Sequence, residues 1–157
     1  MGDSMEIRIA TINDIEQICQ LYTEFFAYNA KLQPKYCKEV KERGNYPKSI
    51  ITDEKSDIII AIENNTILGF IHIQEAETPP YDSVVQHKFA VIIDFIVTVL
   101  CREKGVGKKL MEEAKKWTKL RNLEYIELMV LNNAKEANSF YEKNGFVTVS
   151  HTMRYDL

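Results

Sequence analysis

A short glycine-bearing segment carries the clearest chemistry in this sequence. Arg102-Glu103-Lys104-Gly105-Val106-Gly107 follows the apolar run 89–100 and opens the amphipathic segment 106–120. A strand, a glycine turn and a helix start together make a socket for anionic oxygen atoms, because the first helical amides lack intrahelical partners and the helix dipole favours negative charge there. Glycine also lets a ligand approach the main chain closely. The segment therefore predicts a bound phosphorylated ligand, although the same glycines alone would also suit a plain turn and close helix packing.

Two further side chains could move protons. Tyr141 lies in the run Phe140-Tyr141-Glu142-Lys143-Asn144-Gly145-Phe146, a helix end stopped by a glycine. Its phenol could donate a proton, or its ring could pack in the core beside Phe140. Asp94 stands inside the apolar run 89–100, where an unpaired carboxylate is costly. We therefore expect Asp94 either to be functional or to be tied to structural amides.

The elements that must position these residues follow from hydrophobic periodicity and from turn and cap residues. The expected strands span residues 7–10, 57–63, 67–75, 89–100, 124–131 and 146–155, the last of which could be one strand or a pair of strands. The expected helices begin at Thr11 or Asn13 and end by Pro34, and then span residues 36–43, 106–120 and 134–143. Asn64-Asn65 predicts a hairpin turn between two of the strands. This order predicts one mixed α/β domain over residues 1–157, with residues 1–4 resembling a cloning leader.

Composition limits the function classes. The chain has 157 residues and a formal net charge of −3, with no basic tract and no apolar run long enough to span a bilayer. We therefore expect neither a nucleic-acid nor a membrane partner. Three widely spaced cysteines, Cys19, Cys37 and Cys101, form neither a metal-ligand pattern nor a disulfide framework. This cysteine usage predicts a cytoplasmic protein without a metal site.

Two motifs in the correct order point to a family. The first is Asp94-Phe95-Ile96-Val97-Thr98-Val99 followed by Arg102-x-x-Gly105-x-Gly107, and the second is Ala137-x-x-Phe140-Tyr141-Glu142-Lys143-x-Gly145-Phe146. Together they resemble the acetyl-CoA-binding core of the GNAT superfamily of N-acetyltransferases, and they cover about residues 94–146. The resemblance implies an α/β fold of the α+β type. Its central sheet is mixed but mostly antiparallel, has a splayed pair of strands, and is flanked by helices.

The resemblance implies acetyl-CoA as the co-substrate. Main-chain groups at Val97 and Val99 would hold the pantetheine arm and the acetyl carbonyl, and amides of about residues 102–108 would hold the pyrophosphate. Many relatives carry an asparagine at the position of Ala134, and Asn138 is the nearby residue that could replace it. The implied cofactor-binding residues are Val97, Thr98, Val99, Arg102, Lys104, Gly105, Val106, Gly107, Lys108, Asn138 and Tyr141.

The resemblance also assigns roles in the chemistry. Tyr141 would be the general acid that protonates the CoA thiolate, and the amide of Val97 would face the oxyanion. Asp94 is the first candidate for the general base that deprotonates the acceptor amine. Glu75, Glu77 or His72 could serve instead, and some relatives rely on water alone.

The acceptor is the open part of the prediction. We expect a primary amine of a small molecule that attacks acetyl-CoA directly in a ternary complex, bound between residues 13–43 and the loop 78–88. Tyr28, Glu75 and Tyr81 are the candidate acceptor-binding residues. One alternative is a protein or peptide amine, and another is a non-catalytic domain that binds acyl-CoA for regulation. Relatives are often dimers, some through their C-terminal strands, so a homodimer is among the expectations.

Overall fold

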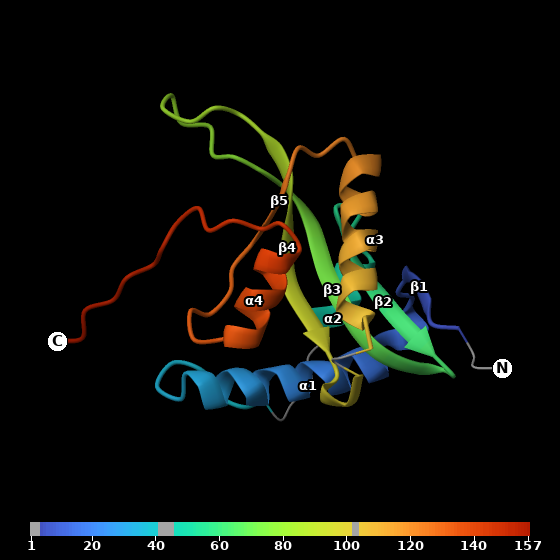
Figure 1. Cartoon of the computed structure of the whole chain (residues 1–157). Coiled ribbons are helices and arrows are strands. Elements are labelled where there is room, and N and C mark those ends of the chain that lie inside the picture. Colours follow the sequence, from blue (N-terminus) through green and yellow to red (C-terminus); the bar gives the residue numbers. More distant parts are fainter. Residues whose placement is uncertain (1–3, 41–45, 102–103) are drawn as a thin grey trace.

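The computed structural model describes residues 4–40, 46–101 and 104–157. These residues form a sheet of five strands with helices on both faces (Figure 1). The strands are β1 (Glu6–Ile9), β2 (Ser56–Glu63), β3 (Thr66–Glu77), β4 (Lys88–Val97) and β5 (Ile126–Leu128). The helices are α1 (Ile15–Leu32), α2 (Tyr46–Ile51), α3 (Val106–Leu120) and α4 (Lys135–Lys143), with short 3₁₀ turns η1 (Ile12–Asp14) and η2 (Val99–Cys101).

The sheet has the mixed, mostly antiparallel topology that the resemblance implies. Its strands lie in the order β1-β2-β3-β4-β5, and only the last pair, β4 with β5, is parallel. The predicted hairpin between β2 and β3 is confirmed. Asn64 and Asn65 both have positive φ, 50° and 61°, which a tight two-residue hairpin turn requires and which asparagine tolerates better than most residues.

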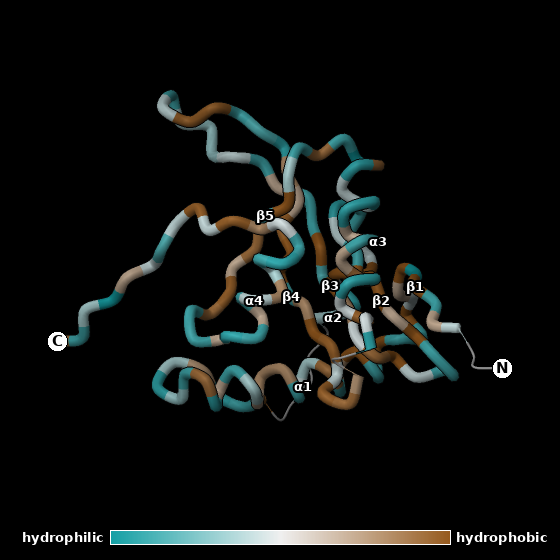
Figure 2. Tube along the Cα trace, in the orientation of Figure 1, coloured by the Kyte–Doolittle hydropathy of each residue, from teal (hydrophilic) through white to brown (hydrophobic). Residues whose placement is uncertain are grey.

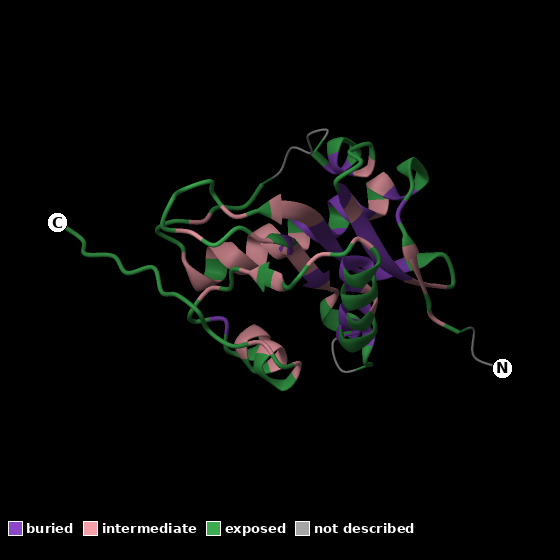
Figure 3. Ribbon diagram, turned by 90° about the horizontal axis from the view of Figure 1, so that it is seen from above, coloured by how far each residue is buried: buried purple, intermediate pink, exposed green. Residues whose placement is uncertain are grey.

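Two hydrophobic clusters hold the helices against opposite faces of the sheet. On one face, α3 buries Val106, Leu110, Met111, Ala114 and Trp117 against β2, β3 and β4. On the other face, α1 and α2 pack through Ile18, Leu21, Tyr22 and Ile50 against Ile58, Ile60, Phe70 and Ile96. Hydrophobic residues gather along the central strands (Figure 2), and burial is concentrated in the same layer (Figure 3). The fold therefore has three layers, with the sheet between α3 on one face and α1 and α2 on the other.

The last two strands separate partway along β4. Parallel pairing joins Ala90 to Ile126 and ends where Ile92 meets Leu128. Beyond Ile92, β4 continues to Val97 with β3 on one side and no strand partner on the other among the described residues. The chain after β5 instead leads into α4. The splayed pair of strands implied by the resemblance is thus present, and it opens a gap between β4 and the segment 129–131.

The predicted helix at residues 36–43 is wrong over its described part. Residues 34–36 form a turn and residues 37–40 are irregular, while residues 41–43 lie outside the described residues. Tyr36 and Val40 are 46% and 39% exposed, so this short segment has no buried apolar face to stabilise a helix. A helix forms further on, at α2, where Pro47 in the first turn loses no hydrogen bond.

The predicted C-terminal strand, residues 146–155, is also wrong. Residues 147–157 extend away from the body without sheet pairing among the described residues (Figure 1). Apolar residues alternate along this segment, which favours an extended chain. Val147, Val149, Met153, Tyr155 and Leu157 are each at least 77% exposed. The alternation is thus real, but this chain does not supply the neighbouring strand that would pair with the segment.

Among the described residues, no helix has the length and apolar character needed to cross a bilayer. Within those same ranges, no group of three or more His, Cys, Asp and Glu side chains is arranged to hold a metal ion.

Candidate active site

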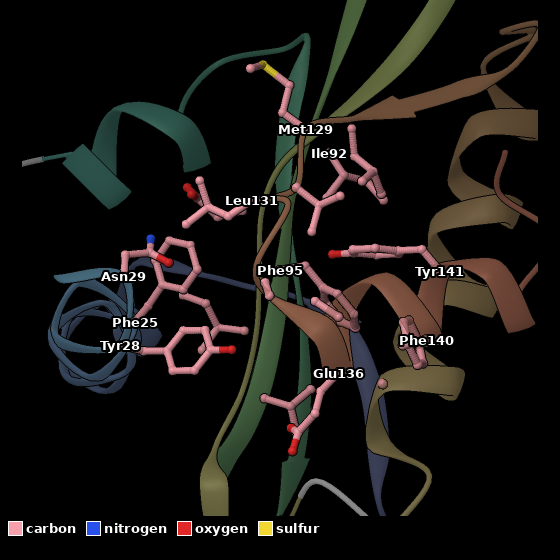
Figure 4. A pocket seen from close by; sticks show the side chains of 18 of the residues that line it. Phe25, Tyr28, Asn29, Ile92, Phe95, Met129, Leu131, Glu136, Phe140 and Tyr141 are labelled. Carbon is pink, nitrogen blue, oxygen red and sulfur yellow. The ribbon is translucent and has the colours of Figure 1, made fainter. Parts of the chain in front are cut away.

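A cavity of about 680 Å³ occupies the gap between β4 and the segment after β5. It is bounded by α1 from one face of the sheet and by α3 and α4 from the other (Figure 4). Its lining includes Glu24, Phe25, Tyr28, Asn29, Ile92, Asp94, Phe95, Val97, Gly105, Gly107, Lys108, Met129, Leu131, Glu136, Phe140 and Tyr141. The volume lies in the usual range of small-molecule sites. Because helices from both faces contribute, a ligand on one side of the sheet can meet a ligand on the other side here.

The start of α3 forms one end of the cavity. Gly105 precedes the helix with φ of 75°, and a side-chain atom placed there would meet nothing within 4 Å, so open space lies above this residue. Gly107 is different, because an added Cβ would lie 3.3 Å from the rings of Phe95 and Phe140. Gly105 thus supplies the left-handed turn and access to the amides. Gly107 allows α3 to pack closely on β4 and α4. Arg102, predicted at this turn, lies outside the described residues.

The turn between β4 and α3 is tied to α1 by a carboxylate. The N–H of Val99 donates a hydrogen bond to Oε1 of Glu24 at 3.0 Å, and the Thr98 hydroxyl lies 3.5 Å from the other oxygen. Thr98 N–H donates to the carbonyl of Leu68 at 2.8 Å. Strand β4 therefore ends at Val97. The prediction that this strand continues to residue 100 is wrong. Of the three predicted cofactor residues here, Val97 lines the cavity, whereas the amide of Val99 is engaged by Glu24.

Tyr141 lies on α4 with its hydroxyl directed into the cavity (Figure 4). Its ring is held by aromatic contacts with Phe95, Phe140 and Phe146, at centroid distances of 6.1, 5.6 and 5.6 Å. Burial raises the pKa of Tyr141 well above that of an exposed phenol, so the hydroxyl keeps its proton at neutral pH. Packing and a directed hydroxyl are both present, so the two interpretations of this residue are compatible.

Asp94 lies on the α1 side of β4 and also lines the cavity. The Tyr22 hydroxyl donates a hydrogen bond of 2.7 Å to Oδ2 of Asp94. Burial, and then the negative charge of Asp94, raise the pKa of Tyr22, so this donor keeps its proton. The side chain of Asp94 is 14% exposed. This carboxylate is therefore held by a tertiary hydrogen bond rather than by structural amides.

Several predicted residues are not brought to the cavity. Glu75 accepts a hydrogen bond of 2.8 Å from Arg121, and Tyr81 is 66% exposed on the loop between β3 and β4. Figure 1 shows that loop beyond the end of the sheet that is remote from α1. The side-chain amide of Asn138 donates to the carbonyls of Leu131 and Ala134, at 2.9 and 2.8 Å. It thus stabilises the loop before α4.

Two further predicted cofactor residues also lie off the lining. Lys104 is exposed in the turn before α3, and the side chain of Val106 is fully buried under that helix.

Sequence reasoning missed some lining residues. Glu136 contributes from α4 and Asn29 from α1 (Figure 4). Glu136 immediately precedes Ala137 and is one helical turn before Phe140, so its spacing could have identified it. Asn29 follows Phe25 by one turn on the same face of α1, which is a similar signal.

The open edge of β4 beside the start of α3 has the shape to hold an extended ligand whose anionic end meets the first amides of the helix. The chain belongs to the acetyltransferase (GNAT) family, whose model matches residues 15–146.

Relatives agree with this assignment. The chain is 28% identical over 142 residues to the uncharacterized N-acetyltransferase YhfO of Bacillus subtilis, covering 90% of this chain and 89% of that protein. Among solved structures, a mutant of the BH1408 protein from Bacillus halodurans has a TM-score of 0.92 at 24% identity, covering 97% of this chain and 99% of that one. The aminoglycoside N-acetyltransferase AAC(6')-Iy, solved with CoA, has a TM-score of 0.75 at 14% identity, covering 100% and 97%. At these identities, the two structures show a shared fold.

Proposed function

We propose that this protein is a single N-acetyltransferase domain that moves the acetyl group of acetyl-CoA to a primary amine of a small molecule. The amine attacks the thioester directly while both substrates are bound. The main support is the cavity between β4 and the segment 129–131. Tyr141 lines one side of this cavity, and Asp94 and Glu24 line the other. A cytoplasmic location fits the three cysteines, Cys19, Cys37 and Cys101, none of which forms a disulfide.

The cofactor end of the cavity suits acetyl-CoA. The edge of β4 between Ile92 and Val97 has no β5 partner, so main-chain groups there can bond the pantetheine amides as a neighbouring strand would. Val97 is our candidate for the amide that stabilises the oxyanion. The amides of Gly105, Val106, Gly107 and Lys108 stand at the start of α3, where the dipole and the open space over Gly105 favour a pyrophosphate.

Tyr141 is the proposed general acid. Expulsion of the CoA thiolate leaves a negative charge in a buried, largely apolar space, and the Tyr141 hydroxyl is directed into that space. Burial weakens Tyr141 as an acid by raising its pKa. Burial also disfavours the charged thiolate, so the free energy of proton transfer from Tyr141 to the thiolate changes less than the pKa of either group. The phenolate is then reprotonated from solvent.

Asp94 is the proposed base toward the acceptor. Tyr22 holds Oδ2 of this carboxylate, and no described residue donates a hydrogen bond to Oδ1, which is therefore available to an ammonium group. Glu24 and Glu136 add two more carboxylates to the lining, and Phe25 and Tyr28 add aromatic faces. Carboxylates and aromatic rings both attract cations. This chemistry favours a cationic amine, and one structural neighbour is named an aminoglycoside N-acetyltransferase.

We further propose a homodimer formed through the C-terminal segment 147–157. Its apolar residues are exposed, and the outer edge of β5 has no strand partner among the described residues. Met129, just after β5, is 92% exposed. The C-terminal segment and the outer edge of β5 are thus two unpaired edges in one chain. In the proposed dimer, the C-terminal segment of one protomer pairs with β5 of its partner and extends the partner's sheet.

The test of the function is thiol release from acetyl-CoA with a panel of polyamines, aminoglycosides, lysine peptides and N-terminal peptides. We expect release with small cationic amines, and mass spectrometry should find one acetyl group on the amine. Release with peptides alone would favour a protein acetyltransferase. Binding of CoA without release from any acceptor would refute the enzymatic proposal in favour of a regulatory domain.

A further inference from the structure

His72 is a buried histidine beside the cavity that the proposed mechanism does not use. It lies on β3 at 3% exposure, and neither ring nitrogen has a hydrogen-bond partner among the described residues. A buried polar group without a partner costs about 1–3 kcal/mol, and most native proteins avoid this cost. A histidine in this position therefore calls for a reason beyond packing.

The strand register brings His72 to Asp94. The two residues are cross-strand partners, and the pairing shifts by one residue between His72 and Ile73, so Ile93 is extra on β4. Such a bulge re-aims the side chains that follow it. Without the extra residue, Asp94 would point to the α3 face of the sheet, because a shift of one residue exchanges the two faces. With it, Asp94 and His72 share the α1 face.

His72 and Tyr22 approach the same carboxylate oxygen. Nδ1 of His72 lies 3.5 Å from Oδ2 of Asp94, and Tyr22 already donates to that atom at 2.7 Å. The imidazole is within ion-pair distance of the carboxylate, but the two groups are not aligned for a hydrogen bond. Catalytic hydrogen bonds are often long until the reactants are bound. A small rotation of either side chain would close this contact.

Besides Asp94, the described groups placed against the imidazole include an aromatic ring and an aliphatic side chain. From α2, the Tyr46 ring packs edge-on against His72 at 5.9 Å. From α1, Tyr22 packs edge-on against Tyr46, and Cys19 lies one turn before Tyr22. From β2 the cross-strand partner is Ile58. Burial raises the pKa of both Tyr22 and Tyr46, so these two phenols stay neutral and Asp94 is the charged group that faces the imidazole.

We propose that His72 is a positioning residue that acts through Asp94, so that the two form one carboxylate–imidazole pair which accepts the acceptor's proton. This inference rests on the proposed acetyl transfer. The ammonium gives one proton to Asp94 Oδ1, and the carboxyl passes this proton to Nδ1 of His72, which leaves Asp94 ionised and the imidazole positively charged. The resulting amine attacks the thioester carbon, the C–S bond breaks, and Tyr141 protonates the thiolate. The amide nitrogen loses its second proton, which restores Tyr141 through solvent, and the pair releases the first proton to water. The net products are the acetylated amine, CoA thiol and one proton.

The pair predicts a specific pH dependence. It can accept a proton only while the imidazole is neutral and the carboxylate is ionised, so activity falls at low pH. In His72→Gln the carboxylate must accept the proton alone, and an ordinary carboxyl group is a weaker base than an ordinary imidazole. We expect the acid limb of kcat at saturating substrates to move to lower pH in His72→Gln, while the plateau falls. His87→Gln, on the exposed hairpin loop, is the matched control and should change neither.

The acid limb separates this role from a structural one. If His72 only fills space, His72→Gln lowers kcat by the same factor at every pH and leaves the limb in place, which would overturn the proposal. A second measurement needs no activity. We expect the ¹⁵N NMR signal of the His72 Nδ1 atom to change between the wild type and Asp94→Asn, because the carboxylate that faces Nδ1 is lost. An unchanged Nδ1 signal would refute the pair even if acetyl transfer is confirmed. Failure of every acceptor would refute the function while leaving the NMR result to decide the pair.

Discussion

The hydroxyl of Tyr141 is the atom on which the proposed chemistry depends most directly. Tyr141→Phe removes this one oxygen and keeps the ring, so the contacts with Phe95, Phe140 and Phe146 persist. No described residue hydrogen-bonds to the hydroxyl, so its loss leaves no stranded partner, and we expect the free energy of unfolding to change by less than about 0.5 kcal/mol.

The expected effect is on turnover. Loss of one general acid lowers kcat by about 10- to 100-fold, at the low end of the usual range because solvent can protonate a thiolate. This corresponds to about 1.4–2.7 kcal/mol in activation free energy. The Michaelis constant for acetyl-CoA should change little, since β4 and the start of α3 supply the proposed binding contacts.

The assay is steady-state thiol release with the best amine of the panel, together with thermal unfolding of each variant. Tyr125→Phe is the matched control, because it removes the same atom from a ring that stacks on Phe89 outside the cavity, and it should keep full turnover. Equal turnover in Tyr141→Phe and the wild type would remove Tyr141 from the mechanism. A large fall in stability would instead make Tyr141 a core residue.

Three other predictions follow from contacts elsewhere in the structure. Gly107→Val should destabilise the fold by about 1–3 kcal/mol through overpacking, because the valine side chain would meet Phe95 and Phe140. Chemical denaturation measures this change, and unchanged stability would contradict the close packing. Hydrogen bonds from Arg8 lower the pKa of Asp14, so this carboxylate stabilises the fold above its unfolded pKa of about 3.9, and the contribution is lost as pH falls below that value. Asp14→Asn should therefore be less stable than the wild type at pH 7, with the difference shrinking toward pH 2; an equal difference at both would be inconsistent with the ion pair. Removal of residues 148–157 should convert a dimer into a monomer in light scattering, and a monomeric wild type would refute the proposed dimer.

Much of the frame that holds the site could be predicted from the sequence, because it depends on local signals. The α3 helix begins at Val106 and ends at Leu120 as predicted, since a glycine turn and an apolar stripe mark it within the segment itself. The hairpin at Asn64-Asn65 is local in the same way. The Gly105 turn and Tyr141 were identified as parts of one site because their motifs match a family.

The remainder depends on contacts that no local pattern encodes. The partnership of His72 with Asp94 requires an extra residue at Ile93, and a bulge of this kind leaves no mark in an apolar run. Tyr81 was expected at the acceptor site, but the length of β3 and β4 carries its loop away from the cavity. The C-terminal segment alternates as a strand should, yet pairing requires a neighbouring edge, which is a property of the assembled sheet rather than of the segment.

The most direct test of the proposed acetyl transfer is a crystal structure of the protein with CoA and an amine that the panel identifies. We predict that the pantetheine arm follows β4 between Ile92 and Val97, with the sulfur within hydrogen-bond distance of the Tyr141 hydroxyl and the pyrophosphate on the amides that begin α3. The amine should enter from the α1 side, with its nitrogen near Asp94. CoA bound outside the gap between β4 and the segment 129–131, or an amine on the same face as the cofactor, would contradict the account.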